Sequence, residues 1–252
     1  ATSVNLATIN TNVSEVPFDL QGRPWDDELL ATRFDRAEDT LLSVIRRYPC
    51  VALALGNEVD AYFSAHPTEL TAFGQLYTQQ VARIHAAIPT LPVGVCTISP
   101  VQNPNAGVGT FLNASSDVAI YTYYPFQPAT DFVHRAPSTL EGDFTAMANA
   151  AGGKPWALQE IGYSSSPVNG GGPAAQAEFM NRFRGRLAAE SRAKLLFANW
   201  FLYTDWDTGL INQLVAYYGG TSPGFRAYLG SLGLRDTMGV PKPAWDQWRV
   251  AR

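Results

Sequence analysis

Short apolar runs alternate along this chain with longer segments whose apolar residues recur at helical spacing. The runs are rich in β-branched and aromatic residues, and most stay apolar on consecutive positions, as strands do when both faces of a parallel sheet are covered. Repeated strand–helix order favours a parallel sheet with right-handed crossovers, so the sequence predicts an α/β fold. The predicted strands lie at residues 3–9, 50–56, 92–98, 117–124, 155–161 and 196–203.

Three of the intervening segments, 26–48, 68–88 and 173–193, carry the clearest helical pattern. Thr68 is a suitable N-cap for the second helix, and Pro173 suits the first turn of the third. Apolar residues at three- and four-residue steps predict which side of each helix faces the core. They are Leu29, Leu30, Phe34, Ala37, Leu41, Leu42 and Ile45 in the first helix, Leu70, Phe73, Leu76, Tyr77, Val81 and Ile84 in the second, and Phe179, Met180, Phe183 and Leu187 in the third.

Length and composition fit one domain over residues 1–252. The chain is 46% apolar, enough to bury a large core, and no stretch rich in Pro or Ser divides it. A net charge of −4 without a basic cluster argues against nucleic acid and anionic membranes as partners. No apolar run approaches the ~20 residues of a membrane span. The start of the chain lacks the pattern of a signal peptide, which leaves its localisation open.

Glycine, cysteine and histidine patterns exclude several classes of α/β protein. No GxGxxG follows an early strand, and Gly170–Gly172 lack the Lys-Ser/Thr of a phosphate loop. The cysteines have no CxxC spacing, and none of His66, His85 and His134 ends a predicted strand. We therefore expect no metal site and no cofactor. A (β/α) barrel, whose reactive side chains stand at the carboxyl ends of the strands, is the better interpretation.

Two glutamates occupy such strand ends. Glu58 follows the run at 50–56, and Glu160 lies near the end of the run at 155–161. Two carboxyl groups at the same rim of a sheet are the equipment for cleaving a glycosidic bond. A single strand-end glutamate is often a surface or helix-capping group. Two at matching positions, one preceded by Asn57, favour a catalytic pair.

The residues around these glutamates resemble the retaining glycoside hydrolases of clan A. In that clan an Asn-Glu pair ends the fourth strand, as Asn57-Glu58 would here, and the nucleophilic Glu ends the seventh, as Glu160 would in QEIGY. The segment TYYPF at 122–126 is similar to the sixth strand of endo-β-1,4-galactanases and β-1,3-glucanases, and Trp200 in FANWFLY matches an eighth-strand tryptophan. The segment GLRDTMGVPKPAWDQW resembles the final turn and helix of such enzymes. The resemblance implies a TIM-type barrel.

The resemblance also implies a reaction and the residues that perform it. We expect retaining cleavage of β-linked hexosides, in an oligo- or polysaccharide, by double displacement. Glu160 would be the nucleophile and Glu58 the general acid and then the general base. Asn57 would bind the sugar 2-hydroxyl, and Tyr124 would donate a hydrogen bond to the nucleophile. Tyr123 is the alternative to Tyr124, because strand register is uncertain by one residue.

Aromatic residues late in the chain would contact the sugar. Trp200 would stack on the apolar face of the ring, and Trp206 would serve an outer subsite. The alternative for Trp200 and Tyr124 is a place in the barrel core. The segment 204–224 is predicted to be a long loop forming a cleft wall. Asp205 and Asp207 would be rim or turn residues in it, with a substrate contact as the alternative.

One feature departs from the clan pattern, because the Asn-Glu strand is here the second rather than the fourth. The sequence thus predicts an incomplete barrel of about six β/α units, equivalent to strands 3–8, without the second-strand Arg of the clan. Six strands would leave apolar edges exposed. The chain could be a piece of a longer enzyme, residues 10–25 could cover the opening, or two copies could pack together. We favour truncation with self-association, as in a homodimer. The alternative function is a catalytically weakened or inactive truncated barrel that binds glycans.

Overall fold

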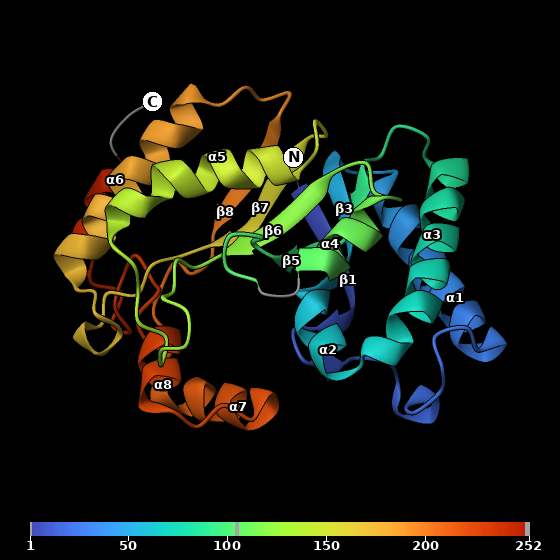
Figure 1. Ribbon diagram of the computed structural model, residues 1–252, viewed down its shortest axis with the longest axis horizontal. Coiled ribbons are helices and arrows are strands. Elements are labelled where there is room, and N and C mark those ends of the chain that lie inside the picture. Colours follow the sequence, from blue (N-terminus) through green and yellow to red (C-terminus); the bar gives the residue numbers. More distant parts are fainter. Residues whose placement is uncertain (1, 104–105, 250–252) are drawn as a thin grey trace. The chain divides into compact units, whose positions relative to one another are not determined.

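The computed structural model describes residues 2–103 and 106–249, which fold into α-helices and largely parallel strands (Figure 1). They form two compact units. The first contains the chain up to Thr122 together with Ala151–Ala157 and Ala193–Phe197, and the second contains Tyr123–Ala150, Leu158–Arg192 and the chain from Ala198 onward. A single domain over residues 1–252 stays a prediction.

All of the predicted apolar runs contain strands. The run at 92–98 is split by Val95, and a short strand after β1 was not predicted. Neighbouring strands follow the orders β2-β1-β3-β4 and β5-β6-β7-β8. The strands are β1 (Thr2–Asn10), β2 (Val13–Ser14), β3 (Cys50–Asn57), β4 (Val93–Gly94), β5 (Cys96–Ile98), β6 (Ala119–Tyr123), β7 (Trp156–Ile161) and β8 (Leu195–Trp200).

Parallel pairing of β1 with β3 brings the ends of the two strands together. The register runs from Thr2 opposite Cys50 to Asn10 opposite Asn57, with an irregularity before the last pair. After Asn10 the chain reverses, and β2 pairs antiparallel to β1 with Val13 opposite Asn10. This hairpin places its turn beside the end of β3. Strand β3 also pairs in parallel with β4, and β5 pairs in parallel with β6.

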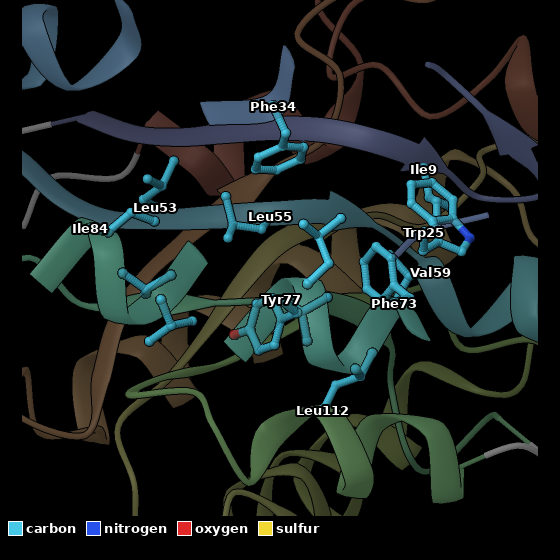
Figure 2. Close-up of a cluster of buried hydrophobic side chains, with 14 of the residues drawn as sticks. Ile9, Trp25, Phe34, Leu53, Leu55, Val59, Phe73, Tyr77, Ile84 and Leu112 are labelled. Carbon is cyan, nitrogen blue, oxygen red and sulfur yellow. The ribbon is translucent and has the colours of Figure 1, made fainter. Parts of the chain in front are cut away.

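Helices of the first unit pack their apolar faces on β1 and β3. Figure 2 shows side chains from α1, α2 and α3 converging on Leu53 and Leu55 of β3. These leucines and the residues packed around them are almost completely buried, and their burial is the main stabilising term of this unit. The helical segments are η1 (Phe18–Leu20), α1 (Glu28–Ile45), α2 (Val59–Ala65), η2 (Pro67–Glu69), α3 (Leu70–Ala87) and α4 (Ala106–Asn113).

Helix α1 forms where it was predicted, but its buried stripe differs from the expected one. Asp27 caps the helix by accepting hydrogen bonds from the Leu29 and Leu30 amides. Leu29 and Ala37, expected in the core, are exposed. The buried residues instead recur at steps of three or four and include a glutamate. They are Leu30, Phe34, Glu38, Leu42 and Ile45.

Burial of Glu38 leaves a carboxyl group without good partners. Its side chain is 0% exposed, and neither carboxyl oxygen accepts a hydrogen bond. Arg83 Nε lies 3.8 Å from Glu38 Oε1, too far for a hydrogen bond. Burial raises the pKa of Glu38 from 4.5 to about 7; the Arg83 charge opposes this rise, and the Asp35 and Asp39 charges add to it. Glu38 is thus protonated more readily in the folded protein than in the unfolded chain.

We predict that Glu38→Leu raises the free energy of unfolding at pH 8 and flattens its pH dependence. Between about pH 4.5 and 7 the unfolded chain releases the Glu38 proton while the folded protein keeps it, so stability falls as pH rises, by up to about 3 kcal/mol. Urea unfolding at pH 5 and pH 8 measures this difference. Glu28→Gln, at an exposed position of the same helix, should change stability by about 0.5 kcal/mol or less at both pH values. An unchanged pH dependence in Glu38→Leu would contradict the prediction.

Helix α3 begins later than predicted, so the assignment of Thr68 as its N-cap was wrong. Pro67 opens a 3-10 turn, and Thr68 lies inside that turn. Glu69 occupies the N-cap position without making a side-chain capping bond. Its carboxylate instead accepts hydrogen bonds from Trp25 Nε1 at 2.8 Å and from the Tyr62 hydroxyl at 2.9 Å.

Helices of the second unit include α6, which begins at Pro173 as predicted and buries Phe179, Met180 and Phe183. Residue Leu187 is half-buried rather than buried. The long loop predicted at 204–224 was wrong, because most of this segment is helical. The elements are η3 (Pro137–Thr139), α5 (Leu140–Ala150), η4 (Pro167–Asn169), α6 (Pro173–Ala189), α7 (Thr208–Tyr218), α8 (Pro223–Leu229) and α9 (Pro243–Arg249).

Local sequence explains the unexpected helices α7 and α8. Asp207 caps α7 by accepting a hydrogen bond from the Leu210 amide, and Ser222 caps α8 by accepting one from the Phe225 amide. Gly219, with φ of 73°, ends α7 in the left-handed conformation that glycine favours. Among the described residues, no helix is both long enough and apolar enough to cross a membrane.

Candidate active site

Glu58 lies directly after β3 with a backbone conformation that is rare for its residue type. Its φ and ψ are 48° and 40°, in the left-handed region, and it precedes the first residue of α2. Gly56, with φ of 94°, permits the chain to bend there; a Cβ at Gly56 would lie 2.5 Å from Val59 Cγ1. Left-handed non-glycine residues cost of order 1–3 kcal/mol and cluster at functional sites.

Hydroxyl groups from two other strands hold the Glu58 carboxyl group. Thr11 Oγ1, just beyond β1, donates to Glu58 Oε2 at 2.8 Å. Thr122 Oγ1, on β6, donates to Glu58 Oε1 at 2.5 Å. Each carboxyl oxygen therefore has its own hydroxyl donor, which orients the group while the side chain stays half-buried.

Two further polar residues lie next to Glu58. Asn57 Nδ2 donates to Asn10 Oδ1 at 3.0 Å, which orients the Asn57 amide group. Asp60 is completely buried and accepts hydrogen bonds from the Ile98 amide at 3.0 Å and from Asn103 Nδ2. Burial, with a further contribution from the Glu58 charge, raises the pKa of Asp60 to about 7. A proton added to Asp60 would thus change the electrostatic field at Glu58 near neutral pH.

Glu160 is the fifth residue of β7, in the second unit, and its carboxyl group is held by a tyrosine. The Tyr124 hydroxyl donates to Glu160 Oε2 at 2.7 Å. Tyr124 directly follows β6 and is 7% exposed, whereas Glu160 is half-buried. A cradle of aromatic rings, formed by Phe126, Phe201 and Tyr228, lies 5.2 to 6.2 Å from the Tyr124 ring between centroids.

Glycine at position 162 gives the Tyr124 ring room to reach Glu160. A Cβ at Gly162 would lie 2.8 Å from Tyr124 Cε1 and 3.0 Å from Leu232 Cδ2. Both contacts are closer than packed carbon atoms accept, so a larger residue would displace the tyrosine ring. The hydrogen bond between Tyr124 and Glu160 therefore depends on the absence of a side chain at Gly162.

Tyr123, the alternative to Tyr124, makes different contacts. It is completely buried, and its hydroxyl donates at 2.5 Å to Asp143 of α5, which also pairs with Arg135. Burial and the Asp143 carboxylate raise the pKa of Tyr123. Side chains alternate across a strand, so adjacent tyrosines contact different layers of the fold. Tyr124, rather than Tyr123, holds the Glu160 carboxyl group.

The two candidate tryptophans also differ. Trp200, the last residue of β8, donates from Nε1 to the Leu232 carbonyl at 3.1 Å, and its ring lies 6.2 Å from that of Phe179 on α6. Trp206 instead lies 5.5 Å from Phe201, which belongs to the cradle around Tyr124. Trp206 is thus connected by ring contacts to the Glu160 cluster, and Trp200 packs on α6.

Asp205 has a structural role. Its carboxylate forms a half-buried ion pair with Lys242, 2.6 Å between Nζ and Oδ2, and accepts a hydrogen bond from the Gly233 amide. Lys242 Nζ also donates to Ser165 Oγ at 2.9 Å. This network joins the segments after β7 and β8 to the C-terminal part of the second unit. Asp207 is the α7 cap described above.

Sequence patterns did not indicate several of these residues. Thr11 carries no motif, and Thr122 opens the TYYPF segment without a predicted role of its own. Both threonines lie far from Glu58 along the chain, and Phe201 was one residue from the predicted Trp200. The signal that could have revealed Asp60 is its position two residues after Glu58. Within residues 2–103 and 106–249, no group of three His, Cys, Asp or Glu side chains is arranged to hold a metal ion.

Comparison with known proteins supports the fold. No model of a protein family matches the chain, and no curated protein sequence matches it. GH5_18 from Streptomyces cattleya, in complex with GlcNAc, superimposes with a TM-score of 0.71 at 16% identity, over 99% of this chain and 63% of that one. A glycoside hydrolase family 17 β-1,3-glucanosyltransferase from Rhizomucor miehei gives 0.52 at 16% identity, over 84% and 70%. A GH2 β-galacturonidase from Eisenbergiella tayi gives 0.56 at 14% identity, over 86% and 36%.

The chain spans less than two thirds of the GH5_18 and β-galacturonidase chains that it resembles. All of these similarities are at low sequence identity, so they describe the fold. The arrangement of strands and helices in this chain is a glycoside hydrolase-like α/β fold.

Proposed function

We propose that this protein is a retaining glycoside hydrolase of the clan A type that cleaves β-linked hexosides by double displacement. Glu160 is the nucleophile, and Glu58 is the general acid and base. The observation that carries the proposal is that both strand-end glutamates are held by hydroxyl donors, Glu58 by Thr11 and Thr122 and Glu160 by Tyr124. The glycoside hydrolase-like fold supports it independently.

The chemistry uses each carboxyl group twice. In the first step the Glu160 carboxylate attacks the anomeric carbon, the bond to the leaving oxygen breaks, and Glu58 transfers its proton to that oxygen. In the second step Glu58 takes a proton from water, the water oxygen attacks the anomeric carbon, and the ester to Glu160 breaks. Retention requires the two carboxyl groups to act about 5–5.5 Å apart, whereas inversion uses a wider separation.

Neighbouring residues would bind the sugar and orient the nucleophile. Asn57, oriented by Asn10, hydrogen-bonds the 2-hydroxyl group next to the anomeric carbon. Tyr124 keeps the Glu160 carboxylate aligned for attack. Trp200 would stack on the apolar face of the sugar ring, and Trp206, whose ring contacts Phe201, offers an aromatic surface for an outer sugar.

A substrate panel tests the proposal. Aryl β-glucoside, β-galactoside, β-mannoside, β-xyloside and β-galacturonide cover simple glycosides. Laminaritriose and Manβ1-4GlcNAc, which are bound by the structurally similar proteins from Rhizomucor miehei and Streptomyces cattleya, cover oligosaccharides. We expect turnover on at least one substrate, with the β-anomer of the released sugar appearing first by proton NMR.

Three outcomes would change the proposal. Initial release of the α-anomer would mean inversion. Turnover no higher than that of Glu160→Ala on the entire panel would refute glycosidase activity. Binding of the oligosaccharides by calorimetry without turnover would favour the alternative, a glycan-binding protein with a glycoside hydrolase-like fold.

We predict that Tyr124→Phe lowers kcat about 10- to 100-fold, which corresponds to loss of one hydrogen bond to a charged group. Tyr123→Phe is the matched control, since it removes the hydroxyl of the adjacent tyrosine, which binds Asp143 instead. That variant should lose about 1–3 kcal/mol of stability and keep its kcat. Steady-state kinetics and thermal unfolding of both variants measure the difference. Equal loss of kcat in both would contradict the role of Tyr124.

A further inference from the structure

We propose that Thr11 and Thr122 are positioning residues for the acid/base glutamate, and that the strained hairpin turn after β1 exists to place the Thr11 hydroxyl on Glu58. This inference rests on the proposed function and adds two residues to it. Its basis is the geometry at the adjoining ends of β1, β3 and β6.

Consecutive residues at the end of β1 contact consecutive residues at the end of β3. Asn10 accepts a hydrogen bond from Asn57, and Thr11 donates to Glu58. The Thr11 amide also donates to the Asn57 carbonyl at 2.8 Å. Thr11 is thus held through its backbone, and its hydroxyl is aimed at one oxygen of the Glu58 carboxyl group.

Backbone strain at Thr11 favours a functional reason for this residue type. Thr11 lies in the turn between Asn10 and Val13 with φ of 56°. Such turn positions favour Gly, Asn or Asp, and a β-branched residue there is an outlier. Glu58, its partner, also has a positive φ, of 48°. Two strained residues joined side chain to side chain indicate that a specific contact is retained at a cost to stability.

Hydroxyl groups suit a carboxyl group that gains and loses a proton in each catalytic cycle. A threonine hydroxyl both donates and accepts hydrogen bonds. An ionised Glu58 carboxylate accepts one hydrogen bond from each threonine hydroxyl, which is the arrangement of the contacts in the structure. When Glu58 is protonated, its O–H group donates to one hydroxyl oxygen, and that hydroxyl turns its hydrogen elsewhere. Lys or Arg at these positions could only donate and would favour the ionised form alone.

Asp60 is a buried titratable group two residues after Glu58, and the Glu58 charge contributes to raising the pKa of Asp60. A negative charge beside a carboxyl group disfavours the ionised form of that group, whereas hydroxyl groups that donate to a carboxylate favour it. Removing the Asp60 charge and removing a threonine hydroxyl should thus move the alkaline limb of the kcat/KM profile in opposite directions along the pH axis. This opposition separates a specific effect on Glu58 from general damage to the fold.

The kinetic experiment compares Thr11→Val, Thr11→Ser, Thr122→Val and Asp60→Asn with the wild type, by the pH dependence of kcat/KM on the best substrate of the panel. We expect the alkaline limb of the kcat/KM profile to lie about one pH unit higher in Thr11→Val and in Thr122→Val, because each variant loses a hydrogen-bond donor to the ionised Glu58 carboxylate. In Thr11→Ser the alkaline limb should lie at the same pH as in the wild type, and in Asp60→Asn it should lie at lower pH. Thr8→Val, which removes a buried β1 hydroxyl without a partner, should leave the profile unchanged.

Thr11→Gly tests the strain argument. Glycine accepts a positive φ, so this variant should be at least as stable as Thr11→Val in urea unfolding. It should nevertheless show the same altered pH profile as Thr11→Val. Higher stability combined with an altered profile identifies a residue kept for function rather than for folding.

Carbon-13 NMR of the glutamate carboxyl groups gives a readout that does not need turnover, with Glu58→Gln identifying the Glu58 signal. We expect its titration midpoint to rise by about one pH unit in both valine variants and to be restored in Thr11→Ser. Coincident midpoints in wild type, Thr11→Val and Thr122→Val would overturn the positioning proposal. Absence of turnover in the wild type would instead refute the glycosidase proposal, while the NMR titration still decides the role of the threonines.

Discussion

Replacing Glu160 with alanine should lower kcat by roughly 10⁴-fold or more on the best aryl β-glycoside, because no other group can form the covalent intermediate. The position of Glu160 on β7 and its hydrogen bond from Tyr124 motivate this expectation. Steady-state turnover of purified wild type and variant gives the ratio. Gln159→Ala is the matched control, as it alters the neighbouring residue of the same strand and should keep most of the activity.

Trapping of the intermediate makes the assignment of Glu160 direct. A 2-deoxy-2-fluoro glycoside with a good leaving group should label the wild type once, and mass spectrometry of peptides should place the label on Glu160. Glu160→Ala should remain unlabelled. A label on another carboxylate would show that the nucleophile is misassigned, even if Glu160→Ala were inactive.

The second large effect is expected for Glu58→Gln and should depend on the leaving group. Glutamine cannot donate a proton, so kcat/KM on an oligosaccharide or a phenyl glycoside should fall about 10²- to 10⁴-fold. A 2,4-dinitrophenyl glycoside needs little protonation, so formation of the intermediate should be far less affected. Added azide should then speed breakdown of the intermediate, since it needs no general base.

Glu69→Gln serves as the control for Glu58→Gln. Glu69 lies in the same unit and accepts hydrogen bonds from Trp25 and Tyr62, so its replacement tests for structural damage alone. It should lower stability without creating a dependence on the leaving group. If Glu58→Gln loses the same factor on phenyl and dinitrophenyl glycosides, Glu58 is not the general acid.

Strands were predictable in this chain because their signal is local and repeated. Buried parallel strands need apolar residues on consecutive positions, and the run that begins near residue 50 and the first half of the run near residue 155 satisfy this plainly. Short helices were harder to predict. The segment 204–224 looked like an aromatic loop, yet the caps Asp207 and Ser222 start helices in it. Capping is decided by one side chain and a few backbone angles, which composition does not indicate.

Side-chain direction was the second property that local pattern left undecided. The sequence allowed either Tyr123 or Tyr124 to approach Glu160, and a shift of one residue along a strand exchanges the two faces. Helix α1 shows the same sensitivity, because a small rotation of its buried stripe exposes Ala37 and buries Glu38. Packing against β3 and α3 sets that rotation.

What the sequence determined by itself is the order of the six main strands and of helices α1, α3 and α6, together with the two glutamates at the ends of β3 and β7, since these follow from apolar periodicity within single segments. Tertiary structure alone decided what surrounds each glutamate. The Thr11 and Thr122 hydroxyls reach Glu58 because parallel strands bring residues that are distant along the chain to a common edge. Tyr124 reaches Glu160 because Gly162 leaves space for its ring. Such contacts depend on distances between segments, which no pattern within one segment contains.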